Sequence, residues 1–272
     1  MTDLETGLPR AGDAAAAARL RRYAGCAAAH SRSGDGWVAV ATGAQSNDMN
    51  GVVSQPGAPI DGALADELLA WFAELGLPAS WLVEGETGDP ALAAVLVERG
   101  ARSEDDGWWA GRGIDDELFG ELAGGDLGDD VTITRVRTSA DLDEWLDVAG
   151  RCGWLVDDRD RRARRRLHLS IGLDSDDLAH WVARRQGRAV AMASSHVTGS
   201  VVDLCNLAVV DRERRQGIGR ALAGERIRAA RERGATTIVS ALSPDGWKLY
   251  ESLGFRSVGV IPDRWFYLPS GP

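Results

Sequence analysis

Residues 207–222 read Leu207-Ala208-Val209-Val210-Asp211-Arg212-Glu213-Arg214-Arg215-Gln216-Gly217-Ile218-Gly219-Arg220-Ala221-Leu222. An apolar strand ends in a basic turn with two glycines, and the spacing that follows predicts an amphipathic helix. Gly217 and Gly219 lack a Cβ atom, so the backbone can come close to a ligand there. The first amides of a helix have no intrahelical partner and point outward at the positive end of its dipole. The stretch therefore predicts a site for an anionic diphosphate.

The surrounding pattern is more specific than the glycines alone. It runs from a strand through R-x-x-G-x-G into a helix, then to a second strand, and ends in L-Y-E-S-L-G-F at residues 249–255. A dinucleotide-binding Rossmann motif is excluded because no G-x-G-x-x-G is followed by an acidic residue at the end of a second strand. A Walker A motif is excluded because Lys248 is the only lysine and no Gly-Lys-Ser/Thr is present.

Taken together, residues 131–268 resemble the GNAT superfamily of acyl-CoA-dependent N-acyltransferases. Arg214, Gly217 and Gly219 fill three diagnostic positions, whereas Asp211 stands where the family often has proline. The resemblance implies an α/β (α+β) domain, in which helices flank a mixed central sheet. It also implies transfer of an acetyl group from acetyl-CoA to an amine.

The resemblance assigns the acetyl-CoA site to the strand, the turn and the start of the helix. The strand backbone is expected to pair with the pantetheine arm, while the turn and the first helical amides bind the diphosphate. Ser243, which stands where many relatives have an asparagine, belongs to the same expected set. The predicted cofactor-binding residues are Leu207, Ala208, Val209, Arg214, Arg215, Gln216, Gly217, Ile218, Gly219, Arg220 and Ser243.

Two side chains are the predicted catalytic groups. Tyr250 stands where the phenol of family members protonates the departing thiolate, although its apolar neighbours also suit a core tyrosine. Asp203 matches the position of the glutamate base in histone-acetylating relatives, and a solvent-exposed aspartate is the alternative. His196 could serve as the base instead. We interpret Cys205 as a core cysteine, because no histidine near it in the sequence would generate a thiolate.

Length, composition and charge restrict the class of protein. A chain of 272 residues, 44% hydrophobic, can form one large domain or two small ones. The net charge of -10 makes nucleic acid an unlikely partner. Three scattered cysteines predict reduced thiols and no metal site. Short apolar runs and an acidic N-terminus predict a cytoplasmic protein with no membrane contact. The arginine run 159–166 is read as a solvated helix face, with an anion- or RNA-binding patch as the alternative.

The two halves of the chain repeat one order of elements. In the C-terminal half we expect strands at 131–136, 180–185, 189–197, 201–209 and 237–240 and helices at 138–148 and 218–233. Thr138 and Asp141 are expected to form a capping box at the start of the first of these helices. The N-terminal half repeats the later part, with helices at 63–75 and 89–99 around a strand at 80–83. Trp108-Trp109-Ala110 in one half corresponds to Trp265-Phe266-Tyr267 in the other.

The repeat predicts two tandem GNAT-like domains. Residues 54–62 of the N-terminal copy have no R-x-x-G-x-G, and their prolines remove amides that a diphosphate would need. We therefore expect residues 1–125 to form a degenerate, non-catalytic domain and residues 131–272 to form the catalytic one. The Gly- and Asp-rich stretch 124–130 is the expected linker.

The expected function is acetylation of the primary amine of a small molecule by direct attack in a ternary complex. Acetylation of protein or peptide N-termini is a second possibility within the same fold. An aminoacyl-tRNA-dependent transferase and a non-catalytic acyl-CoA-binding protein are two others. The acceptor pocket is expected from residues 154–160, 197–200 and 261–264, and the chain is expected to be a monomer or a homodimer.

Overall fold

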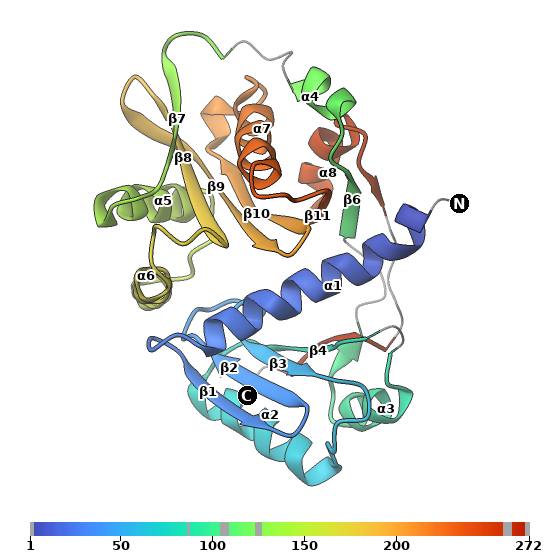
Figure 1. Ribbon diagram of the computed structural model, residues 1–272. Coiled ribbons are helices and arrows are strands. Elements are labelled where there is room, and N and C mark those ends of the chain that lie inside the picture. The colour runs from blue at the N-terminus through green and yellow to red at the C-terminus, as the bar shows by residue number, and fades with distance from the viewer. Residues whose placement is uncertain (1–2, 86–87, 104–108, 123–126, 258–262, 270–272) are drawn as a thin grey trace. The chain divides into compact units, whose positions relative to one another are not determined.

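The computed structural model describes residues 3–85, 88–103, 109–122, 127–257 and 263–269, which form two compact units (Figure 1). The first unit comprises residues 1–15, 108–156 and 172–258. The second comprises residues 16–107, 157–171 and 259–272. Each unit contains one mixed β-sheet with flanking helices, which confirms the predicted fold class.

The first unit has a seven-stranded sheet in the order β12-β6-β11-β10-β9-β8-β7. Its strands are β6 (Trp109–Gly113), β7 (Val131–Arg135), β8 (Leu178–Arg185), β9 (Arg188–Thr198), β10 (Val201–Val209), β11 (Thr237–Ala241) and β12 (Arg256–Ser257). Its helices are α4 (Asp116–Leu122), α5 (Ser139–Arg151), α7 (Ile218–Arg231) and α8 (Pro244–Glu251), with a 3-10 turn η1 (Asp211–Glu213). β10 and β11 run parallel, and the other described pairs are antiparallel.

The second unit has a six-stranded sheet in the order β1-β2-β3-β4-β13-β5. Its strands are β1 (His30–Gly34), β2 (Trp37–Ala41), β3 (Gly51–Ser54), β4 (Ser80–Val83), β5 (Arg102–Ser103) and β13 (Trp265–Tyr267). Its helices are α2 (Gly62–Leu75), α3 (Pro90–Glu98) and α6 (Asp158–Ile171). The long helix α1 (Asp3–Ala24), which the sequence analysis did not predict, is divided between the units after Ala15.

The two sheets exchange their corresponding strands. β6 comes from the N-terminal half of the sequence but pairs with β11 and β12 of the first unit. β13 comes from the C-terminal end but pairs with β4 and β5 of the second unit. We expected each of these strands in the sheet of its own half, and that expectation is wrong. The compact units consequently do not follow the expected division into 1–125 and 131–272.

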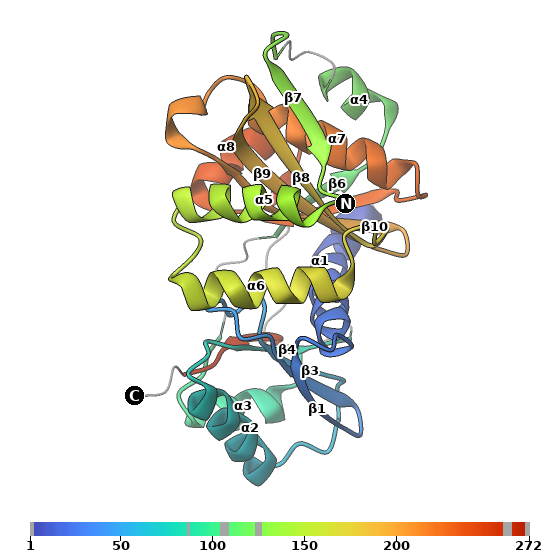
Figure 2. The ribbon, with the colours of Figure 1, turned by 90° about the vertical axis from the view of Figure 1, so that its left-hand side faces the viewer.

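Opposite faces of the first unit's sheet carry different helices. The predicted capping box starts α5, since the hydroxyl of Thr138 accepts from the Asp141 amide at 3.1 Å and the Asp141 carboxylate accepts from the Thr138 amide. α5 buries Trp145 and its apolar neighbours on one face of the sheet, and α7 buries Leu222 on the other (Figure 2). Side chains of successive strand residues therefore point alternately toward the face covered by α5 and the face covered by α7.

The arginine run lies on α6, which the structure groups with the second unit. Arg159, Arg162 and Arg166 are exposed, in agreement with a solvated face. Arg164 instead is buried and forms an ion pair with the fully buried Asp160 at 3.0 Å. The Asp160 carboxylate also accepts from the amide of Gln45 at 2.9 Å, so part of the run serves packing within this unit.

Candidate active site

The site is centred on the place where β10 and β11 separate. The two strands pair only from Val201 to Asp203, although β10 continues to Val209. A bulge interrupts the pairing of β10 with β9 between Cys205 and Ala208, where Asn206 has a φ of 55°. An irregularity of this kind re-aims backbone groups at the rim of a sheet. The second half of β10 therefore has one edge without a parallel neighbour among the described strands.

The turn after β10 leads directly to the N-terminus of α7. Gly217 is the N-cap residue, with a φ of 81° and no side-chain capping bond. The first amide of the helix that bonds a carbonyl is that of Ala221, which donates to Gly217 at 3.0 Å. The amides of Ile218, Gly219 and Arg220 thus lie before the first helical hydrogen bond and remain available to an anion.

Side chains of the turn form hydrogen bonds to neighbouring backbone carbonyl groups. Nε of Arg214 donates to the carbonyl of Val209 at 3.0 Å, and Nε2 of Gln216 donates to that of Arg212 at 3.0 Å. Arg220 donates twice to the carbonyl of Glu121, at 3.2 and 2.6 Å. These bonds hold the turn in shape before any ligand arrives, which lowers the entropic cost of binding.

The surroundings of Gly219 suit a ligand that is charged at one end and apolar along its length. A Cβ atom at this position would lie 3.4 Å from Leu249 and 3.9 Å from both Leu207 and Val209. Between residues 211 and 220 four arginines outnumber two acids, so this loop is basic in a chain with a net charge of -10. The residues present therefore fit a diphosphate and its aliphatic arm.

Tyr250 lies on the α7 side of β10. It is 2% exposed and packs in one cluster with Val202 and Leu204. Its ring meets that of Phe255 edge-on at 4.9 Å, and its hydroxyl oxygen accepts a hydrogen bond of 2.9 Å from Nη2 of Arg226. Tyr250 is therefore packed in the core, in agreement with its apolar neighbours in the sequence, and its hydroxyl oxygen has a polar partner in Arg226.

Asp203 lies on the opposite face of β10 because it precedes Leu204 in the strand. It is 1% exposed and pairs in register with His196 of β9, so the two side chains are cross-strand neighbours on one face. The solvent-exposed alternative for Asp203 is thus wrong. Asp203 and His196 are brought together, whereas Tyr250 packs on the other face of β10.

A second histidine lies on the face of Asp203. Nδ1 of His180 is 2.7 Å from the hydroxyl of Ser194, and its ring centroid is 5.3 Å from that of Trp145 on α5. Burial, together with the positive charge of Arg135, lowers the pKa of His180 to about 4. His180 is therefore a neutral, packed histidine at physiological pH.

Arg226 is the site residue that the sequence analysis missed. It lies in the middle of α7, is fully buried, and donates to the carbonyls of Leu222, Ser194 and Cys205 as well as to Tyr250. A signal was available, because position 226 falls four residues after Leu222 in the buried stripe of the helix. A charged residue in such a stripe is unusual unless it has polar partners.

Two other predicted residues have structural partners. The hydroxyl of Ser243 caps α8 by accepting from the amide of Gly246 at 3.2 Å. Cys205 is partly buried, and its carbonyl is one of the acceptors of Arg226.

Within the described ranges, no group of three or more His, Cys, Asp or Glu side chains is arranged to hold a metal ion.

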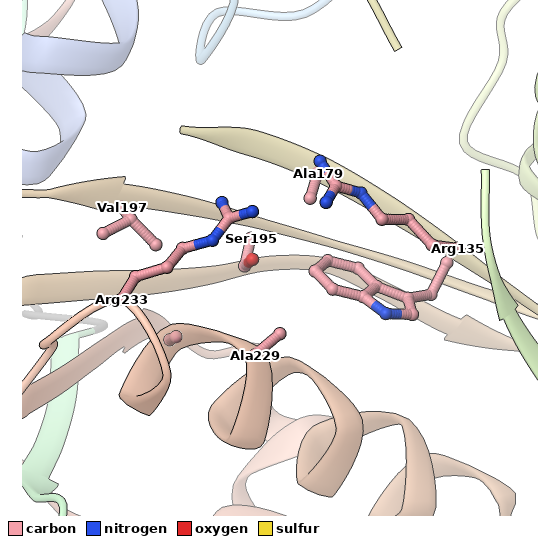
Figure 3. Close-up of a pocket in the computed structure, with 8 residues that line it drawn as sticks. Arg135, Ala179, Ser195, Val197, Ala229 and Arg233 are labelled. Carbon is pink, nitrogen blue, oxygen red and sulfur yellow. The ribbon is translucent and has the colours of Figure 1, made fainter. Parts of the chain in front are cut away.

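The first unit also contains a small cavity at the other end of α7. It is lined by Arg135, Ala179, Trp181, Ser195, Val197, Ala229, Ala230 and Arg233, and Figure 3 shows Arg135 and Arg233 approaching Ser195. Its volume of about 10 Å³ is that of a single water molecule. Ala229 follows Gly217 by twelve residues, roughly 18 Å along a helix. This cavity is therefore separate from the proposed cofactor site and too small for an amine substrate.

In the second unit, β3, β4 and the N-terminus of α2 occupy the positions of β10, β11 and the N-terminus of α7, but their geometry is different. β3 and β4 stay paired from Gly51–Ser80 to Ser54–Val83, and the amide of Glu84 continues the ladder by donating to Ser54 at 2.8 Å. The N-cap residue of α2 is Asp61, whose carboxylate accepts from the amide of Leu64 at 2.9 Å. Neither an opening between strands nor a neutral glycine cap is present there.

Comparisons with known proteins bear on the family and on the fold. Residues 140–255 match the family described as "Acetyltransferase (GNAT) family". The chain carries a GNAT N-acetyltransferase domain, for which acetyl-CoA is the cosubstrate, and the predicted class is confirmed. No curated protein matches the sequence.

Similar folds occur in solved structures that span nearly the whole chain. A GCN5-related N-acetyltransferase from Kribbella flavida is 20% identical, with a TM-score of 0.65 and 96% of each chain covered. A tandem GNAT protein from the clavulanic acid biosynthesis pathway is 15% identical, with a TM-score of 0.54 and 97% of this chain and 95% of that chain covered. A functionally unknown protein from Staphylococcus epidermidis is 14% identical, with a TM-score of 0.60 and 89% and 93% covered. The predicted tandem arrangement is thereby confirmed at the level of the fold.

No helix among the described residues is both long enough and apolar enough to cross a membrane.

The predicted linker lies partly outside the described residues, as do Trp108 and part of the predicted acceptor segment 261–264.

Proposed function

We propose that this protein transfers an acetyl group from acetyl-CoA to a primary amine of a small molecule, by direct attack within a ternary complex. The observation that carries the proposal is the uncapped N-terminus of α7 at the open edge of β10. Gly217 caps α7 without a side-chain bond, and the three amides that follow it have no hydrogen-bond partner among the described residues. They lie beside a basic turn, and the apolar side chains around Gly219 continue from it. A diphosphate joined to an aliphatic thioester arm is complementary to both parts.

The cofactor-binding residues keep the roles that the resemblance implies. Amides of residues 215–220 bind the diphosphate, with Arg214 and Gln216 fixing the shape of the turn. The backbone of Leu207, Ala208 and Val209 pairs with the pantetheine arm along the edge that β11 leaves uncovered. Ser243, whose oxygen already caps α8, can still donate its hydroxyl proton. Bound acetyl-CoA supplies the thioester carbonyl.

Asp203 and Tyr250 handle the protons of the reaction. Asp203, with His196 opposite it, accepts the proton that the attacking amine loses as the new C–N bond forms. Tyr250 donates its hydroxyl proton to the sulfur as the C–S bond breaks, and it recovers a proton afterwards. Because they lie on opposite faces of β10, Asp203 can take the proton from the amine on one side while Tyr250 donates a proton to the sulfur on the other.

The N-terminal copy supports the fold and does not bind acetyl-CoA in this proposal. Its paired strands and the carboxylate of Asp61 occupy the places that a pantetheine arm and a diphosphate would need.

A panel of primary amines tests the proposed function directly. Thiol release from acetyl-CoA is followed with aminoglycosides, amino acids, polyamines and peptides with free N-termini. We expect a small-molecule amine to give a kcat/KM well above that of every peptide. A preference for peptides would overturn the small-molecule assignment, and release that never exceeds water-driven hydrolysis with any amine would overturn the transferase assignment itself.

A further inference from the structure

Arg226 is a buried cation for which a purely structural role gives a poor account. It is 0% exposed, and its four hydrogen bonds all go to neutral oxygens. No carboxylate forms an ion pair with it among the described residues. Burial of a charge without an opposite charge is costly, and an apolar residue of similar volume often serves packing as well or better. Arg164 of the second unit shows the usual solution, since its buried guanidinium pairs with Asp160 at 3.0 Å.

The direction of the hydrogen bond between Arg226 and Tyr250 is fixed by chemistry. A guanidinium has five N–H donors and no acceptor, so the phenol oxygen must accept the 2.9 Å bond from Nη2. The hydroxyl proton of Tyr250 cannot lie on that bond. It is left to donate in another direction, which a general acid requires.

The same guanidinium also holds the bulge of β10. Nη1 donates to the carbonyl of Cys205 at 3.2 Å and to that of Ser194 at 2.9 Å, and these two residues face each other where the ladder between β9 and β10 is interrupted. One rigid planar group thus connects the irregular strand to the phenol. A change of Arg226 would disturb the distance between them.

We propose that Arg226 is a positioning residue that orients the hydroxyl of Tyr250 as proton donor and stabilises the negative charge that forms on its oxygen as the proton leaves. The inference rests on the proposed function, because it needs Tyr250 to act as the acid. A fixed, buried cation stabilises developing charge without having to reorganise. This function explains why a charge is kept in the core at that position.

A double-mutant cycle tests the inference, with kcat, the KM for acetyl-CoA and the unfolding midpoint measured for each variant. Arg226→Met should lower kcat by about 10- to 100-fold in the otherwise unchanged protein, with the KM for acetyl-CoA within about threefold. In a Tyr250→Phe background the same substitution should lower kcat by less than about threefold, because the group through which it acts is gone. A loss of kcat that is equal in both backgrounds would overturn the inference.

Arg112→Met is the matched control. Arg112 is a mostly buried arginine of the same unit that donates to the carbonyl of Leu253 and pairs with Glu121, without touching Tyr250. Its effect on kcat should be the same in both Tyr250 backgrounds. If Arg226→Met does not fold, Arg226→Lys carries the test, because one ammonium cannot serve Tyr250 and both strand carbonyls at the guanidinium geometry. Wild-type kcat in folded Arg226→Lys would overturn the inference.

The cycle separates the two proposals. If Tyr250→Phe alone has wild-type kcat when chemistry limits the rate, the acid role of Tyr250 fails and the inference about Arg226 fails with it. If Tyr250→Phe is slow but Arg226→Met gives additive losses, only the inference about Arg226 fails.

Discussion

Gly217 and Asp61 occupy equivalent positions in the two units, the N-caps of α7 and α2. Gly217 leaves the helix end open, whereas the carboxylate of Asp61 accepts from the amide of Leu64 at 2.9 Å. A carboxylate at this position satisfies the amides that an anion would bind and also repels it. This one difference predicts which unit can bind a diphosphate.

We therefore expect one CoA molecule to bind per chain. Isothermal titration calorimetry with CoA should give a stoichiometry of one, and Asp61→Gly should not raise it, because β3 and β4 remain paired along their length. A stoichiometry of two for the unchanged protein would show that the second unit has been misinterpreted.

Asp substitutions at the two glycines of the turn should abolish CoA binding while the fold persists. At Gly219 the added Cβ meets Leu249 at an ordinary contact distance of 3.4 Å, and an acid in the first turn of a helix is favourable by about 0.3–1 kcal/mol. CoA affinity should nevertheless fall by at least about 100-fold, because charge-assisted bonds to the diphosphate are lost.

Gly187→Asp is the control for Gly217→Asp. Both glycines have a positive φ, 77° and 81°, so both substitutions cost similar backbone strain and add the same charge. Calorimetry should show normal CoA binding for Gly187→Asp only. Unchanged CoA affinity in a folded Gly217→Asp or Gly219→Asp protein would remove the basis of the assignment.

Tyr250→Phe should lower kcat by about 100-fold, or about 2.7 kcal/mol of activation free energy, with little change in acetyl-CoA affinity. The structure adds an expectation for stability. Arg226 loses an acceptor, so the free energy of unfolding should fall by about 1–3 kcal/mol. Steady-state kinetics and denaturant unfolding measure the two effects separately. Lost stability with unchanged turnover would make Tyr250 a structural residue.

A fragment of residues 131–272 should not fold cooperatively. It lacks β6, which lies between β11 and β12 in the first unit's sheet, so backbone groups of both strands would lose their partner. A fragment that starts at residue 109 restores β6 and is the control. Thermal unfolding followed by circular dichroism distinguishes them, and a sharp transition in the shorter fragment would contradict the importance of the exchanged strand.

His180 should make stability depend on pH between about 6.5 and 4. Its pKa is lowered from 6.5 to about 4 in the folded protein, so the unfolded chain binds a proton at a higher pH than the folded one. The stability that neutral His180 contributes is complete above pH 6.5 and decreases as the pH falls to about 4, by about 3 kcal/mol in total. His180→Asn, whose amide can still meet Ser194, should flatten this part of the profile in urea unfolding. An unchanged slope would contradict the assignment.

The sequence indicated the cofactor turn and most of the regular elements well, because these depend on local signals. The glycine turn at Gly217, the capping box at Thr138 and the strand before the turn each depend on residues that lie within a few positions in the sequence. The strand exchange could not be predicted in this way, since Trp109 and Trp265 suit either sheet equally by their residue type. Helix α1 was missed because its hydrophobic pattern is weak and it contains Gly7, Pro9 and Gly12. The role of Arg226 could not be predicted from local signals, because its partners Ser194, Cys205 and Tyr250 lie 32, 21 and 24 residues away in the sequence.

The exchanged strands also bear on how the chain folds as it is synthesised. The sheet of the second unit is drawn almost entirely from the first hundred or so residues, yet β13 must enter between β4 and β5. Those two strands leave the ribosome long before residues 265–267 exist. The sheet of the second unit therefore lacks one strand until residues 265–267 have been synthesised, and the pairing of β13 with β4 and β5 joins residues that are far apart in the sequence. A truncation that removes residues 265–267 would damage the half of the protein that was made first.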